Sequence, residues 1–191
     1  QLNASIIRIN KGGTFMIDNN GTTRSGNRVL DTTPITLDSA DGAFSGETVV
    51  RGLAIRSDQD GTLDETVGVV TAASGANYVG MTTSGANDDT DIIVSDLVRL
   101  NNATINIRGT AMGGTDAREN EFRIGDTDNR DNFVAAMVGG GGAAGSTNLS
   151  IIPWAIGETV AAGLGSANMG NSLLKYADSP HTGTRALYFG T

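Results

Sequence analysis

The sequence predicts an all-β fold in which short strands stack on one another as a parallel β-solenoid. A strand–turn–strand phrase, IRINKGGTFMID at 7–18, recurs as VRLNNATINIR at 98–108. The chain contains 27 glycines, whereas aromatic residues make up only 5% of it. No amphipathic helix is evident, because the best candidate, residues 132–145, contains a run of glycines that each cost a helix about 1 kcal/mol.

The composition fits a narrow core filled by Ile, Val, Leu and Ala. Hydrophobic residues form 38% of the 191-residue chain, which argues against disorder and suffices for one domain. The net charge of −8 disfavours a nucleic-acid-binding surface. No apolar run approaches the roughly 20 residues that span a bilayer, so we do not expect a transmembrane segment. The absence of cysteine excludes disulfides and thiolate metal sites.

Period-2 apolar patterns, separated by Gly, Asn, Asp and Ser turns, predict the individual strands. In chain order, they are expected near residues 5–9, 14–18, 28–30, 34–37, 48–56, 66–73, 77–82, 92–94, 97–100, 104–108, 121–124, 149–156, 173–176 and 185–189. So many short strands without a convincing helix indicate an all-β architecture.

The repeats decide which all-β architecture is expected. In a solenoid, like residues stack on like about 4.8 Å apart, so Asn10 and Asn101 would occupy equivalent corners. Asn tolerates left-handed backbone angles there, and its amide can bond a neighbouring turn of the chain. The Glu-Thr-Val triplets at 47–49 and 65–67 lie 18 residues apart, which agrees with coils of about 18 to 25 residues. A β-sandwich with chance similarities between its strands is the alternative.

Several phrases occur in an order that carries a family resemblance. They are IRINKGGTFMIDNNG, ITLDSADGAFSG, ETVGVVTAASGAN, SIIPWAIGE and LLKYADSPHTGTRAL. This set resembles the autotransporter-associated β-strand repeat regions of bacterial surface passenger proteins. The resemblance covers most of the chain and implies a right-handed parallel β-helix outside a bacterial cell, with no particular enzyme activity. We therefore expect residues 1–191 to form a single solenoid module, with a Gly-rich excursion at about 139–147.

Neither end of the sequence contains an amphipathic capping helix or a charged plug. An uncapped solenoid exposes a strand edge and its core, which another copy can cover. We therefore expect copies to assemble head-to-tail. The expected interface comprises Ile6, Ile7 and Ile9 at one end and Leu187, Tyr188 and Phe189 at the other. Caps that lie outside this sequence are the alternative.

Acidic turns are the main candidates for metal chemistry. Asp58 and Asp60 lie in DQDGTLDE, and Asp126 and Asp128 lie in DTDNRD. Calcium takes about six to eight oxygen ligands, and alternate Asp residues on a turn can supply several of them. These four residues are candidate calcium ligands, although neither phrase matches the full calcium-loop motif. Solvated turns are the alternative, and no other cofactor is expected.

Catalytic chemistry is not expected. Adjacent carboxylates such as Asp88 and Asp89 point to opposite faces of an extended chain, which does not favour an acid–base pair. His181 is the single histidine, so histidine-based triads are excluded. Trp154 shares a period-2 face with Ile152 and Ile156, which predicts packing in the core or in an interface.

The strand pattern and the family resemblance together predict a non-enzymatic structural module, which assembles end-to-end into a fibre and which the resemblance implies belongs to an extracellular bacterial surface protein. A carbohydrate-binding adhesin that holds surface glycans on one solenoid face is the alternative. A polysaccharide-cleaving enzyme ranks below both.

Overall fold

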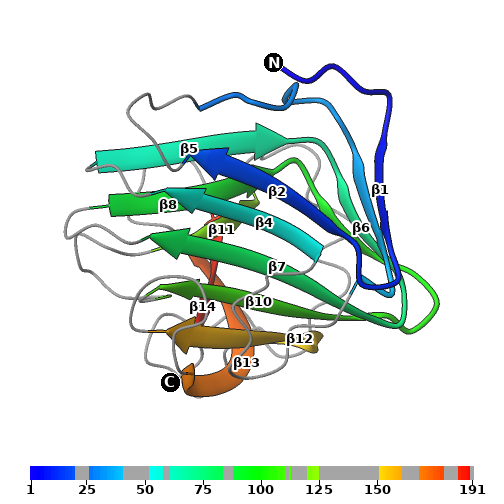
Figure 1. The fold of residues 1–191 in the computed structure, drawn as a ribbon. Coiled ribbons are helices and arrows are strands. Elements are labelled where there is room, and N and C mark those ends of the chain that lie inside the picture. The colour runs from blue at the N-terminus through cyan, green and yellow to red at the C-terminus, as the bar shows by residue number, and fades with distance from the viewer. Residues whose placement is uncertain are drawn as a thin grey trace.

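The computed structural model describes most of the chain. The described residues are 1–19, 26–40, 52–57, 61–83, 88–110, 112, 120–124, 151–160, 168–178 and 185–189. They form β-strands and no helix (Figure 1). Accordingly, no apolar helix of membrane-spanning length occurs among the described residues.

The strands agree broadly with the pattern in the sequence. They are β1 (Ile7–Asn10), β2 (Thr14–Asn19), β3 (Ile35–Asp38), β4 (Gly52–Ser57), β5 (Gly61–Val67), β6 (Val70–Ser74), β7 (Ala76–Thr83), β8 (Asp88–Val94), β9 (Leu97–Arg99), β10 (Thr104–Thr110), β11 (Phe122–Ile124), β12 (Ile151–Val160), β13 (Asn168–Asp178) and β14 (Arg185–Phe189).

Most strands pair in parallel and form three ladders. Ladder A is the four-stranded sheet β1-β3-β6-β9. Ladder B is the series β2-β4-β7-β10-β12, and ladder C is the series β5-β8-β11. From β3 onward the chain passes from ladder A to ladder B to ladder C, and it does so through β3-β4-β5, β6-β7-β8 and β9-β10-β11.

The circuits of the chain are longer than the sequence predicts. On ladder A, the residues at positions 7, 35, 70 and 97 are register partners, so successive circuits advance by 28, 35 and 27 residues. The Glu-Thr-Val spacing of 18 residues is therefore not the length of a circuit. Residues 65–67 lie in β5, and residues 47–49 lie outside the described residues.

A left-handed backbone residue marks each corner between ladders A and B that the structure describes. Lys11, Ser39, Gly75 and Asn101 have φ angles of 38°, 55°, 58° and 46° at this corner. Gly75 and Asn101 adopt this region readily, whereas Lys11 and Ser39 are held in it at a cost of roughly 1–2 kcal/mol each.

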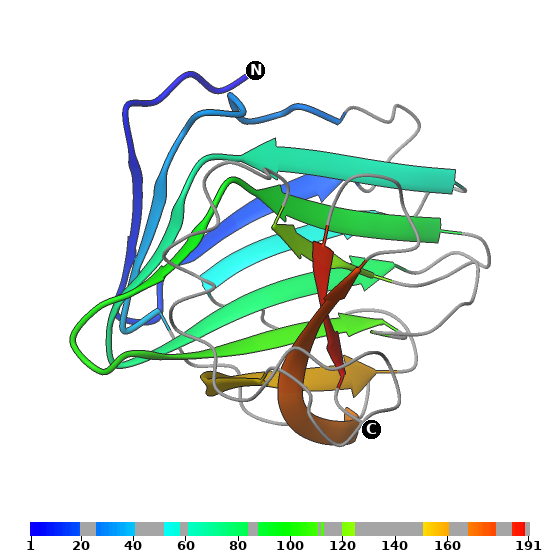
Figure 2. The ribbon, with the colours of Figure 1, turned by 180° about the vertical axis from the view of Figure 1, so that it is seen from behind.

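The C-terminal strands change the direction of pairing. β13 runs antiparallel to β12, and β14 runs antiparallel to both β13 and β11. Ladders B and C are thereby joined into one ten-stranded sheet, in the order β2-β4-β7-β10-β12-β13-β14-β11-β8-β5. The β13–β14 pair crosses the molecule at this end (Figure 2), which we call the closed end.

The opposite end differs because β2 and β5 are the two outer strands of the ten-stranded sheet, and β1 is an outer strand of ladder A. We call this the open end. At the closed end, antiparallel strands pair with β12 and β11, which the expectation of two uncovered ends did not include, while β9 is the outer strand of ladder A there.

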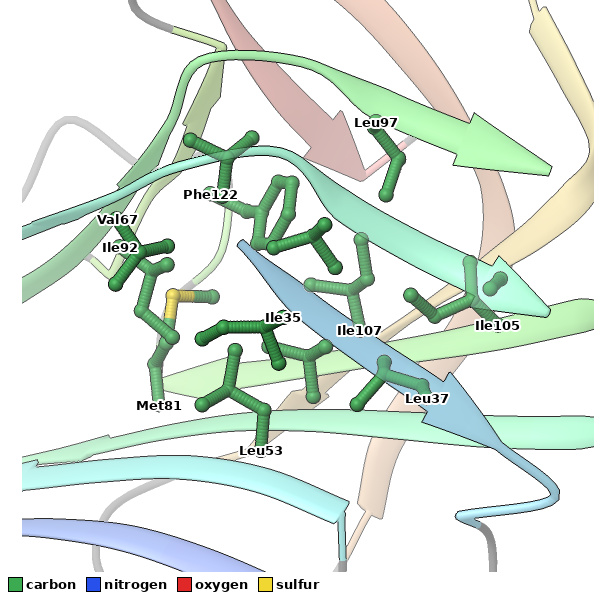
Figure 3. Close-up of a cluster of buried hydrophobic side chains, with 14 of the residues drawn as sticks. Ile35, Leu37, Leu53, Val67, Met81, Ile92, Leu97, Ile105, Ile107 and Phe122 are labelled. Atoms are coloured by element: carbon green, nitrogen blue, oxygen red, sulfur yellow. The ribbon is translucent and has the colours of Figure 1, made fainter. Parts of the chain in front are cut away.

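The core lies between the three ladders (Figure 3). It is built by columns of apolar side chains in register, such as Phe15, Leu53, Val79 and Ile107 on ladder B. Ile35 and Leu37 of ladder A and Phe122 of ladder C are fully buried against them. Branched and mid-sized side chains fill this narrow space, as the scarcity of aromatic residues predicts.

Candidate functional site

A buried charged cluster occupies the outer side of ladder C. Ile92 and Val94 of β8 and Phe122 and Ile124 of β11 belong to the core. Because strand side chains alternate, the neighbouring Asp91 and Arg123 lie on the other side of the ladder. Asp91 and Arg123 are nevertheless 0% and 5% exposed.

Arg123 binds three carboxylates from three successive strands or their ends. Its Nε donates to Oε2 of Glu121 at 2.8 Å, and its Nη2 lies 3.4 Å from Oδ1 of Asp64. Nη2 also forms an ion pair with Oδ2 of Asp91. The main-chain N–H of Glu121 donates to Oδ1 of Asp91 at 2.7 Å, which ties β11 to β8.

This charged cluster, Asp64, Asp91, Glu121 and Arg123, has the chemistry of a structural ion network. The guanidinium of Arg123 lies where the three carboxylates converge. Consistently, no group of carboxylates or histidines with metal-binding geometry occurs among the described residues. The arrangement ties β5, β8 and β11 together on the outer side of the ladder.

Glu65 lies on the opposite side of β5, among the core residues Leu63 and Val67, and is 0% exposed. Its Oε1 accepts from the main-chain N–H of Val29 at 2.6 Å, and its Oε2 accepts from that of Arg28 at 2.9 Å. Burial raises the pKa of Glu65 above its usual 4.5, although these main-chain donors act in the opposite direction. Glu65 thus holds residues 28 and 29 against ladder C at the open end.

Asn77 ties three circuits of the chain together at the corner between ladders A and B. Its Nδ2 lies 3.0 Å from O of Ser74 and 3.1 Å from O of Thr104, while its Oδ1 accepts from the N–H of Ala40 at 3.1 Å. The side chain is 1% exposed. Asn77 was not predicted as a corner residue, although its place at the end of the Ala-Ser-Gly-Ala-Asn phrase was a usable signal.

The predicted corner residues lie close to the expected places. Asn10 ends β1 and pairs in register with Asp38, but the left-handed residue at its corner is the following Lys11. Asn101 has a φ of 46°, and its Nδ2 donates to O of Ala73, one circuit earlier, at 3.1 Å.

The predicted interface residues fall at the two ends. Ile6 is 38% exposed, Ile7 is partly buried and Ile9 is 4% exposed, and Ile7 and Ile9 lie in β1. At the other end, Leu187, Tyr188 and Phe189 belong to β14, whose main chain pairs with β13 and β11 on its two sides.

Trp154 is 4% exposed and belongs to the core, in the company of Ile152. Ile156 does not share this environment, because it is 47% exposed, while Ala155 is buried. The prediction that Ile156 shares the buried face of Ile152 and Trp154 is therefore wrong. The guanidinium of Arg99 lies 5.9 Å from the centre of the indole ring, within the range of a cation–π contact.

The remaining candidates fall outside the described side chains. Asp58, Asp60, Asp126, Asp128, His181 and residues 139–147 lie outside the described residues. Asp88 and Asp89 begin β8, and their side chains are not described. The calcium hypothesis therefore stays a prediction.

Comparison with known proteins gives no relative. No protein-family model matches the chain, and neither a curated protein nor a solved structure matches it. The resemblance to autotransporter-associated repeats thus stays a prediction that rests on the quoted phrases.

Proposed function

We propose that this chain is a non-enzymatic structural module of an extracellular bacterial surface protein, folded as a single right-handed parallel β-solenoid. The observation that carries the proposal is the repeated passage of the chain through ladders A, B and C with residues in parallel register. Parallel crossovers are right-handed in about 98% of cases, which supports the handedness. The surface location rests on the family resemblance of the quoted phrases.

The mechanism is mechanical. Hydrogen bonds between parallel strands run along the stacking direction in all three ladders, and the apolar columns run beside them. Each circuit is held to the next by many such bonds, so bending or stretching the stack has to strain them together. The charged cluster and Asn77 add side-chain ties between circuits in the same direction.

The module assembles end-to-end through its open end. An outer strand presents unpaired main-chain groups, which favour association with another chain. β1 is such a strand among the described residues, and Ile6 lies exposed beside it. In a head-to-tail arrangement, the open end of one copy meets the β13–β14 end of the next through side chains, because the main chain of β14 is paired on both sides.

Light scattering and electron microscopy of the purified chain over a range of concentrations test this function. We expect elongated assemblies that grow with concentration. Ile6→Lys, which places a charge beside the outer strand, should leave a folded monomer. Thr71→Lys is the control, since Thr71 lies on the outer side of β6, a strand that is paired on both sides with β3 and β9. Monodisperse monomers of the wild-type chain at high concentration, or assembly of Ile6→Lys at the wild-type level, would contradict the proposal.

A further inference from the structure

A stripe of polar side chains lies inside the molecule at the corner between ladders B and C. Asn19, Ser57 and Thr83 end β2, β4 and β7 and are register partners, so they stack about 4.8 Å apart. Thr90 lies on β8, the next strand across this corner. We call these four residues the corner stripe.

The corner stripe faces the core. Ile17, Ile55 and Met81 precede its members by two residues on the same strands, and all three belong to the core. Because side chains two residues apart share a face, Asn19, Ser57 and Thr83 point inward as well. The four residues are 1%, 2%, 1% and 0% exposed, in chain order.

Among the described residues, three polar atoms of the corner stripe have no hydrogen-bond partner. They are Nδ2 of Asn19, Oγ1 of Thr83 and Oγ1 of Thr90. The orientation of the Asn19 amide is fixed, since its Oδ1 accepts from Nε of Arg28 at 2.9 Å. Its Nδ2 is therefore a buried donor that needs an acceptor, and both threonine hydroxyls can donate and accept.

We propose that the corner stripe binds a short file of ordered water molecules inside the stack. Buried polar groups in folded proteins are almost always paired, and an interior water that makes two to four hydrogen bonds is the usual partner. Globular proteins contain on the order of one such water per 27 residues, so a few in this chain are expected. The water molecules accept from Asn19 and exchange hydrogen bonds with Thr83 and Thr90, which links ladder B to ladder C. This inference does not depend on the proposed function.

A high-resolution crystal structure of the wild-type chain tests the proposal directly. We expect solvent peaks within hydrogen-bonding distance of Nδ2 of Asn19 and of Oγ1 of Thr83 and Thr90. A corner without solvent, in which the hydroxyls bond main-chain carbonyls, would overturn the proposal. A metal ion in place of water, identified by its shorter ligand distances, would also overturn it.

The Thr83→Val variant gives an independent reading in solution, because valine matches threonine in shape. If the hydroxyl of Thr83 binds water, the substitution deprives a buried water molecule of one hydrogen-bond partner. The ratio of unfolded to folded protein at a fixed urea concentration should then rise roughly 5- to 30-fold. If the corner is dry, removal of an unpaired hydroxyl leaves the ratio unchanged or lowers it. Thr36→Val is the control, since Thr36 lies on the outer side of β3, between Ile35 and Leu37 of the core. Should Thr83→Val fail to fold, the wild-type crystal structure alone decides.

Discussion

Arg123 is the residue on which the outer side of ladder C depends. Its guanidinium forms ion pairs with Asp64, Asp91 and Glu121. Removing one partner of a buried ion network leaves uncompensated charges and costs far more than removing an exposed pair.

We therefore expect Arg123→Met to lower the free energy of unfolding by about 3–5 kcal/mol at neutral pH. Urea denaturation at neutral pH measures this loss. Arg56→Met is the control, since Arg56 pairs with Asp18 at a partly exposed site and should cost less than about 1 kcal/mol. An Arg123→Met variant as stable as Arg56→Met would contradict this role.

Glu65 should make stability depend on pH in the direction opposite to that expected for an ordinary ion-paired carboxylate. Because burial raises its pKa in the folded state, the folded chain binds this proton more tightly than the unfolded chain does. The associated stability is present below pH 4.5, the usual value, and is lost as the pH rises through the higher folded pKa.

The Glu65→Gln variant isolates this contribution. We expect the stability of the wild type relative to Glu65→Gln to fall as the pH increases through that interval and then to stay constant. Parallel stability curves for the two proteins between pH 4 and pH 8, measured by urea denaturation, would exclude a raised pKa at Glu65.

At the scale of single elements, the corner between ladders A and B depends on the amide of Asn77. It bonds main-chain groups of residues 40, 74 and 104, which belong to three successive circuits. We expect Asn77→Ala to destabilise the chain by about 2–4 kcal/mol, since it leaves several buried main-chain groups unpaired.

Hydrogen exchange locates the effect of this substitution. The amide of Ala40 should lose its protection first, because it donates to Asn77 itself. Asn106→Ala is a suitable control, since Asn106 is only partly buried and its side chain donates to Glu158 on the outer side of ladder B. Unchanged protection of Ala40 in Asn77→Ala would show that the corner is held by other contacts.

The strands themselves were largely predictable from alternation, and the exceptions have physical reasons. Residues 28–30 were expected as a strand but form only a single bridge, between Leu2 and Val29, because Glu65 takes the N–H groups of residues 28 and 29. Residues 66–73 were expected as one strand but are divided at Gly68, where a Cβ would lie 2.7 Å from O of Thr32. A run that is apolar on both faces does not reveal where a chain turns from one ladder to the next.

The charged cluster was not predictable from single phrases. Asp64, Asp91 and Glu121 each resemble a solvated turn residue in their own sequence context. Their spacing carried a signal, since Asp64 and Asp91 are register partners 27 residues apart, close to the circuit lengths on ladder A. This spacing can be recognised only if the circuit length is known. The Glu-Thr-Val spacing predicted a circuit that is too short.

At the scale of the whole molecule, parallel stacking was predictable and the closure was not. The repeated phrase at 7–18 and 98–108 corresponds to β1-β2 and β9-β10, so the same phrase is used for the same two ladders. The antiparallel return through β13 and β14 has no local signature, because alternation is identical in parallel and antiparallel strands. The difference between the two ends of the molecule therefore cannot be predicted from the sequence repeats alone.

Thiol cross-linking tests the parallel register most directly, since the chain has no cysteine and introduced thiols are unambiguous. Thr36, Thr71 and Val98 follow one another on ladder A as register partners. Cysteines at 36 and 71, or at 71 and 98, should lie about 4.8 Å apart, so a short bifunctional thiol reagent should cross-link them. Cysteines at 36 and 98 should lie about 9.6 Å apart, so the same reagent should not cross-link them. Efficient cross-linking of both neighbouring pairs, and none of the outer pair, is the predicted result. Failure of the neighbouring pairs in folded variants, or equal reaction of all three, would contradict the stacked parallel fold.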